Sequence, residues 1–167
     1  LTELDVTSST AASNWGSVAT AFVYHVYRDG VEIGTTNLPE FEDAGLMPET
    51  TYIYTVAAEN EAGTGTASTG LAITTTPTPP ATPAAPTISD VTNTSLTVTW
   101  TAVTGADSYR IWRAQSGSAF GDFVDLGIDV VGTTYPDENL IPGTGYRYKI
   151  QAENEGGLSP LSAYGEA

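Results

Sequence analysis

One phrase occurs twice in this chain and constrains its fold more than any other feature. The pattern Leu-x-Pro-x-Thr-x-Tyr stands at residues 46–52 and again at 140–146, so that its two tyrosines lie 94 positions apart. A second landmark repeats as well, because Trp15 and Trp100 each precede a tyrosine by nine residues. Self-similarity at a period near 90 residues predicts two copies of one domain.

Each copy carries the short alternating runs of a β-sandwich. In the second copy Leu96, Val98 and Trp100 alternate with polar residues, and residues 146–152 alternate again. Glycine, proline, asparagine and aspartate bound these runs, and no helical period of useful length interrupts them. The pattern therefore predicts an all-β protein whose strands bury one face.

Both copies resemble fibronectin type III domains through the Trp-Tyr spacing and the Leu-x-Pro-x-Thr-x-Tyr phrase. The resemblance implies two tandem immunoglobulin-like, seven-stranded β-sandwiches at residues 1–74 and 87–167. In such a fold Tyr52 and Tyr146 would be structural tyrosine corners, each bonding back to upstream backbone. The proline- and threonine-rich residues 75–86 are expected to form an extended linker that acts as a semi-rigid spacer.

Composition excludes several kinds of partner and site. The formal charge of −15, from 20 acidic and five basic residues, opposes binding to nucleic acid or to anionic membranes. Cysteine is absent, so thiolate chemistry and Cys-based metal sites are excluded. No apolar run is long enough for membrane insertion. We expect neither a metal nor a cofactor.

Four residues of the second copy form a candidate ligand- or partner-binding site. Strand parity places Arg110, Trp112, Arg147 and Lys149 together on the outer face of neighbouring strands, as a basic and aromatic patch. An exposed indole beside cations is suited to stacking a sugar ring or anchoring a protein. The alternative is that these long side chains only pack against one another across the strands.

Other chemically suggestive residues favour structural interpretations. His25 is the single histidine of the chain and is predicted to be exposed. A catalytic triad or a histidine-based metal site would have no second member to recruit. The Asp29-Gly30 dipeptide is typical of a tight hairpin turn. Several carboxylate pairs are predicted to be solvated loop acids, namely Glu59 with Glu61, Glu153 with Glu155, and Asp137 with Glu138.

The two copies differ at two places. Matching residues 34–36 to 132–134 indicates a 13-residue insertion in the second copy, from Ala114 to about Gly127. The first copy has Ala11 and Ser13 where the second has large apolar residues. Phe22 or Phe41 could fill the vacated space, the sheets could lie closer, or another chain or an upstream segment could complete this region.

These features predict a non-enzymatic function. The resemblance extends to accessory modules of secreted bacterial carbohydrate-active and surface proteins, which implies a spacer or binding module pair outside the cell or on its surface. Its partners would be a polysaccharide, a protein or further copies of itself. The alternative is a structural or adhesive subunit of an extracellular filament or phage tail, assembling through its β-sandwich domains.

Overall fold

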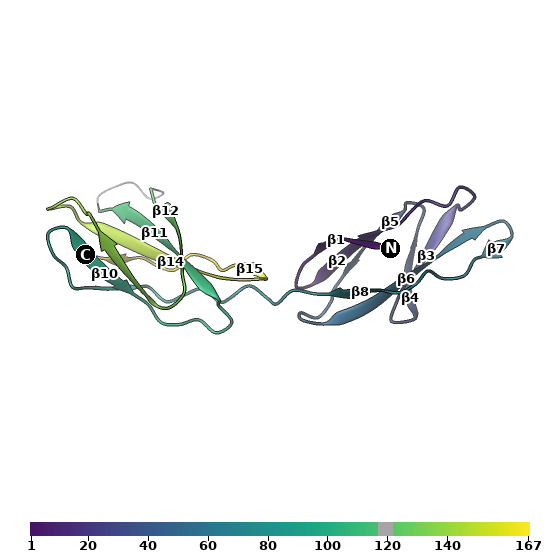
Figure 1. The fold of residues 1–167 in the computed structure, drawn as a ribbon, viewed down its shortest axis with the longest axis horizontal. Helices are drawn as coiled ribbons and strands as arrows, with labels where there is room; N and C mark the ends of the chain where they lie inside the picture. The colour runs from purple at the N-terminus through teal and green to yellow at the C-terminus, as the bar shows by residue number, and fades with distance from the viewer. Residues whose placement is uncertain (117–121) are drawn as a thin grey trace. The chain divides into compact units, whose positions relative to one another are not determined.

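The computed structural model describes residues 1–116 and 122–167, which fold into two compact units (Figure 1). Unit 1 comprises Leu1–Thr78 and unit 2 comprises Pro79–Ala167, so the division falls inside the predicted linker. Both ends of that segment pack onto protein, because Thr75 is buried near one end and Pro86 at the other. Thr75 donates through Oγ1 to the Met47 carbonyl at 2.6 Å. The role of residues 75–86 as a semi-rigid spacer stays a prediction.

Unit 1 consists of two facing antiparallel sheets, ordered β1-β2-β5 and β4-β3-β6-β7, with β8 also paired to β6. The alternation of small or apolar residues with polar ones gives inner strands such as β2 and β3 one buried face. The strands are β1 Thr2–Val6, β2 Thr10–Asn14, β3 Val23–Arg28, β4 Val31–Thr36, β5 Glu40–Ala44, β6 Thr51–Asn60, β7 Gly63–Thr64 and β8 Leu71–Thr74.

Unit 2 repeats this arrangement with sheets ordered β13-β10-β9 and β12-β11-β14-β15, and with β16 also paired to β14. The prediction of an all-β chain with two sandwiches is therefore confirmed. The strands are β9 Thr87–Ser89, β10 Ser95–Thr99, β11 Ser108–Gln115, β12 Val124–Val130, β13 Thr134–Glu138, β14 Tyr146–Asn154, β15 Gly157–Leu158 and β16 Gly165–Glu166. Among the described residues, no helix is long and apolar enough to cross a membrane.

The last strand of each sandwich is split in two, so the described residues of each unit form eight strands where seven are expected. Serine hydroxyls bridge the gap, because Ser68 Oγ accepts from the Val56 amide at 3.1 Å. In unit 2, Ser162 Oγ accepts from the Ile150 amide at 2.9 Å. A hydroxyl here takes the place of a backbone carbonyl, so the buried amide of the neighbouring strand keeps a partner.

The predicted turn and tyrosine corners have the expected local geometry. Asp29 and Gly30 both adopt positive φ, at 52° and 79°, as a two-residue hairpin turn requires. The Tyr52 hydroxyl accepts a hydrogen bond from the Met47 amide at 2.9 Å, and the Tyr146 hydroxyl accepts one from the Ile141 amide at 3.1 Å. Each bond ties the start of the long strand back to the upstream loop.

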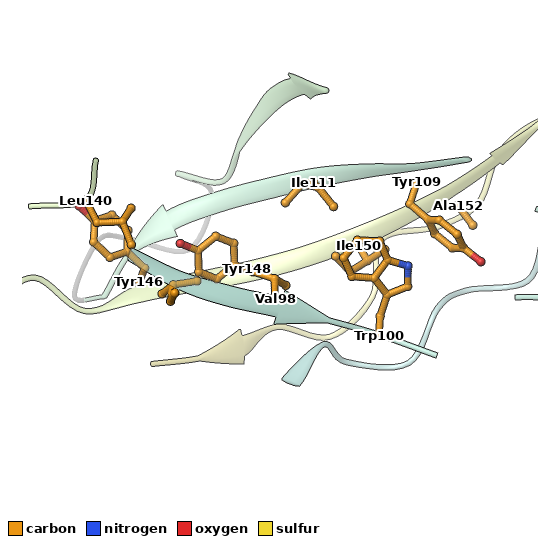
Figure 2. Packing of buried hydrophobic residues seen from close by; sticks show 10 residues of the cluster. Val98, Trp100, Tyr109, Ile111, Leu140, Tyr146, Tyr148, Ile150 and Ala152 are labelled. Atoms are coloured by element: carbon orange, nitrogen blue, oxygen red, sulfur yellow. The ribbon is translucent and has the colours of Figure 1, made fainter. Parts of the chain in front are cut away.

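The core of unit 2 is one continuous cluster between its two sheets (Figure 2). Trp100 directly follows β10, and its ring meets that of Tyr109 edge-on at 5.4 Å. The Tyr109 hydroxyl accepts a hydrogen bond from the Val103 amide at 2.7 Å. The buried members are Leu96, Val98, Trp100, Tyr109, Ile111, Leu140, Tyr146, Tyr148, Ile150 and Ala152.

The small residues of β2 are covered from within unit 1. Ala11 is 3% and Ser13 4% exposed, and Ala11 packs with Leu46, Tyr54 and other apolar side chains. Phe22 is 55% exposed, so the suggestion that it fills this space is wrong. Ser13 also lines a surface hollow together with Leu4 and Phe41, so completion of this region by another chain and self-association stay predictions.

The burial of Ala11 predicts that a larger side chain at this position will not fit. Ala11→Leu, which restores the residue type found at Leu96, should destabilise unit 1 by about 1–3 kcal/mol through overpacking. Urea unfolding of the full chain measures the change, with Ala12→Leu on the opposite face of the same strand as the control. A stabilised Ala11→Leu variant would mean that the space is vacant.

The insertion of unit 2 lies in a single hairpin. Arg28 pairs with Val31 across two residues, whereas Arg113 pairs with Val124 across ten. Part of this longer hairpin, residues 117–121, lies outside the described residues. Its strands also contain a bulge next to Trp112.

The register corrects the predicted length of this insertion. Tyr24 pairs with Thr36, and the equivalent Tyr109 pairs with Val130, so Thr36 corresponds to Val130 rather than to Thr134. The offset between the copies thus rises from 85 to 94 at the hairpin and then stays constant, which makes the insertion nine residues long. The Gly-Thr-Thr match was misleading because cross-strand pairing, not local similarity, decides register.

Candidate ligand-binding face

The four candidate residues occupy the outer side of the sheet that contains β11 and β14. We call this surface the Trp112 face, after its central aromatic residue. Trp112 pairs with Lys149 across the two strands, and two residues further along β11, Ala114 pairs with Arg147. Arg110 lies opposite Gln151. These side chains lie on one face because side chains alternate along each strand, and the residues between them point into the core.

The Trp112 face is not the basic patch that the sequence predicts. Arg110 donates through Nε and Nη2 to both carboxylate oxygens of Glu153, at 2.9 and 3.0 Å. Asp125 and Asp129 lie 3.9 and 3.7 Å from the same guanidinium. These three acids come from the flanking strands, and together they more than neutralise the single cation. The surface around Trp112 therefore offers no excess positive charge for an anionic ligand.

Arg147 is also not exposed as predicted, since only 8% of the residue is accessible. Its guanidinium carbon lies 5.7 Å from the Phe123 ring centre and 5.4 Å from that of Tyr164. Nη2 donates to the Gln115 carbonyl at 3.2 Å. The ammonium of Lys149 lies 4.7 Å from the Phe123 ring centre. Both cations are thus held by aromatic rings, in contacts that strengthen as water is excluded.

Sequence reasoning missed Phe123 and Tyr164, which extend the face by two aromatic rings. The two ring centres are 6.5 Å apart, and Tyr164 is 40% exposed. Phe123 precedes β12 and Tyr164 precedes β16, so neither belongs to the alternating strands that revealed the other residues. The folding of two separate segments over β14 brings them together.

Trp112 is the part of this face best suited to contact a ligand. Its side chain is half-buried, and its indole Nε1 donates to Gln151 Oε1 at 3.2 Å. This hydrogen bond restrains the orientation of the ring. A fixed aromatic surface surrounded by amide and carboxylate groups can stack on an apolar ring face while hydrogen-bonding its edge.

Three of the six carboxylates predicted as loop acids lie on strands and form ion pairs, namely Glu59, Asp137 and Glu153. Asp137 is buried and accepts two hydrogen bonds from Arg113 Nη1, both 2.9 Å, and one from the Tyr148 hydroxyl at 2.7 Å. Burial, reinforced by Asp137, raises the pKa of the Tyr148 hydroxyl far above its ordinary value. Among the residues that the structure describes, no group of three or more metal-ligating side chains is placed to hold an ion.

Unit 1 repeats this buried ion pair with the same three residue types. Arg28 Nη1 donates to Asp43 Oδ2 at 2.8 Å, and the Tyr54 hydroxyl donates to the same oxygen at 2.8 Å. Burial, with a smaller contribution from Asp43, raises the pKa of Tyr54 as well. Because both units contain the same cluster, we infer that Asp43 and Asp137 stabilise the fold.

The profile of the fibronectin type III domain matches residues 81–167, which lie within unit 2 and make up more than half of the chain. The chain belongs to the fibronectin type III family. Its resemblance to this family, first inferred from the repeated tyrosine phrase, is thereby confirmed.

Two glucanases of Cellulomonas fimi are similar to nearly the whole fibronectin type III pair. Exoglucanase B is 35% identical over 157 residues, which cover 84% of this chain and 13% of the enzyme. Endoglucanase B is 32% identical over 143 residues, which cover 78% of this chain and 13% of the enzyme. The chain thus spans about one eighth of the length of these relatives.

Solved structures show the same fold at lower identity. The FN1–FN3 domains of chicken CNTN1 superpose with a TM-score of 0.69 at 19% identity, covering 96% of this chain and 60% of that one. Likeness at this level of identity concerns the tandem sandwich architecture alone.

Proposed function

We propose that this chain is a non-catalytic accessory module of an extracellular polysaccharide-degrading enzyme. The observation that carries the proposal is the match to Exoglucanase B, which spans 84% of this chain but 13% of that enzyme. A stretch of this size, built from two sandwiches, supports or orients a catalytic region located elsewhere. An enzyme that acts on insoluble glucan works outside the cell, and the module would be located with it.

The state of the carboxylates supports a non-catalytic role. Glycoside hydrolysis needs one carboxylic acid and one free carboxylate facing each other across the substrate. In this chain Glu153 is paired with Arg110, Asp137 with Arg113, and Glu59 with His25. Acids that are bound to cations in the folded state are poorly suited to protonate a glycosidic oxygen.

The Trp112 face is the surface on which the module would contact polysaccharide. Across the face, the three cations Arg110, Arg147 and Lys149 are matched by three acids, so the face suits a neutral chain better than a polyanion. Trp112 supplies an aromatic surface, and Gln151 supplies an amide beside it. Phe123 and Tyr164 continue the aromatic surface along β14. A neutral glucan presents apolar ring faces and hydroxyl edges, which these groups complement.

Two measurements on the intact chain test this role. Reducing-end release from soluble glucan should be absent, while the protein should be retained on insoluble cellulose or chitin. Hydrolysis by the purified chain would overturn the non-catalytic assignment. Absence of retention on every neutral polysaccharide would reduce the role to that of a spacer and refute binding at the Trp112 face.

Trp112→Ala should weaken retention on the polysaccharide about fivefold or more, because a central aromatic contact contributes at least about 1 kcal/mol to binding. Depletion isotherms on insoluble glucan provide the measurement. Tyr27 occupies the equivalent position in unit 1, so Tyr27→Ala is the matched control and should leave retention unchanged. Equal retention by the wild type and Trp112→Ala would exclude this face.

A further inference from the structure

His25 of unit 1 lies between two carboxylates that belong to different strands. Its Nε2 is 2.5 Å from Glu59 Oε2 on β6, and its Nδ1 is 3.2 Å from Glu32 Oε1 on β4. The side chain is 19% exposed, so the sequence prediction of an exposed histidine is wrong. The ring points outward as parity requires, but long acidic side chains from both neighbouring strands cover it.

The geometry favours a protonated ring. A carboxylate only accepts hydrogen bonds, and a neutral imidazole carries one N–H donor and one lone pair. With a carboxylate at each ring nitrogen, the neutral form would direct its lone pair at one of them. The imidazolium donates at both nitrogens and forms two charge-assisted hydrogen bonds.

The surroundings of this cluster supply no competing cation. Across from His25, β4 places Thr35 and β6 places Ala57. Thr64 on β7 donates to Glu59 Oε2 at 3.4 Å and adds no charge. Within the described part of the chain, Glu32 and Glu59 are the charged groups that contact the ring.

Unit 2 has the same cluster with a permanent cation. Arg110 occupies the place of His25, one residue after the core tyrosine of the strand. It is bound to Glu153 on β14 and faces Asp125 on β12, as His25 is bound to Glu59 and Glu32. The two units therefore carry one electrostatic link built with different cations, and one of these titrates near neutral pH.

We propose that His25 is a pH-dependent clamp of unit 1. Protonation ties β3 to both β4 and β6, and deprotonation releases one of these two links. Arg110 keeps the corresponding links of unit 2 closed throughout the neutral range. Unit 1 therefore tightens in mildly acidic surroundings while unit 2 does not respond.

The direction of the pH effect follows from the contacts. The hydrogen bond with Glu59, followed by that with Glu32, raises the pKa of His25 above its ordinary value of 6.5, against the opposing effect of burial. A raised pKa in the folded state stabilises the fold fully below the unfolded pKa. The stabilisation is then lost as the pH rises through the folded pKa of His25.

A nuclear magnetic resonance titration of the imidazole tests the clamp directly, because His25 is the single histidine of the chain. In the wild type the pKa should lie above 6.5, and in the Glu32→Gln/Glu59→Gln double variant it should return toward that value. A glutamine amide oxygen still accepts a hydrogen bond but carries no charge, and its NH2 group can instead donate to an unprotonated ring nitrogen, so the charged ring loses its advantage. A wild-type pKa at or below 6.5, or one that the double variant leaves unchanged, would overturn the proposal.

Thermal unfolding of the full chain at about pH 6 and about pH 8 tests the consequence for stability. The methyl resonances of Val26 and Ile111, both fully buried, report units 1 and 2 separately. The melting temperature of unit 1 should fall between the two pH values in the wild type, and this fall should disappear in His25→Arg and His25→Gln. An undiminished fall in His25→Arg would assign the pH response to other groups.

Discussion

Asp137→Ala is expected to destabilise unit 2 by about 3 kcal/mol, because it leaves two polar groups without their shared acceptor. The Tyr148 hydroxyl is fully buried and would lose its hydrogen bond. Arg113 is one-third exposed, so water would partly compensate its lost ion pair, which keeps the cost at the lower end for a broken buried pair. Urea unfolding, monitored through resonances of β14, gives the free-energy change.

The neighbouring Glu138 supplies the control for this prediction. It is exposed and one position further along β13, so Glu138→Ala should change the stability by about 0.5 kcal/mol or less. A similar cost for the two substitutions would show that the buried Arg-Asp-Tyr group contributes nothing beyond surface charge.

Trp100→Ala is expected to destabilise unit 2 by about 3–5 kcal/mol, since it removes the largest side chain of the core. The side chain is buried and meets Tyr109 edge-on at 5.4 Å. Figure 2 shows it among the core residues of both sheets, near Ile150. Its removal leaves a cavity that the surrounding strands, fixed by their hydrogen bonds, cannot close.

Trp112 is the internal comparison for Trp100, because the same residue type stands on the outer face of β11 in the opposite sheet. Trp112→Ala should cost about 1 kcal/mol or less in stability, while weakening the proposed binding. Urea unfolding of both variants under one condition separates the roles. Equal destabilisation by the two substitutions would contradict the division into a core tryptophan and a surface tryptophan.

The location of the candidate face could be predicted from the sequence, but its character could not. Alternation along β11 and β14 is a local property, and it correctly placed Arg110, Trp112 and Lys149 on one side of the sheet. The acids that neutralise Arg110 come from strands whose register no local pattern specifies. The rings that cover Arg147 come from loops, where side-chain alternation carries no information.

Unit 1 illustrates the same limit of local patterns. The sequence identifies the small side chains of Ala11 and Ser13, but whether a space opens beside them depends on how closely the opposite sheet packs. Parity places His25 outward, yet Glu32 and Glu59 reach it because pairing brings their strands alongside. In both cases the deciding contacts join residues that are far apart in the sequence.

The sequence by itself determined that this protein is a tandem pair of fibronectin type III domains, because the Trp-Tyr spacing and the repeated tyrosine phrase are short-range patterns with local physical causes. Backbone turns, strand alternation and tyrosine corners need only neighbouring residues. Only the tertiary structure decided which charges meet, how long the insertion is and which cation titrates. Those properties depend on cross-strand register, and register is set by the packing of the whole sandwich.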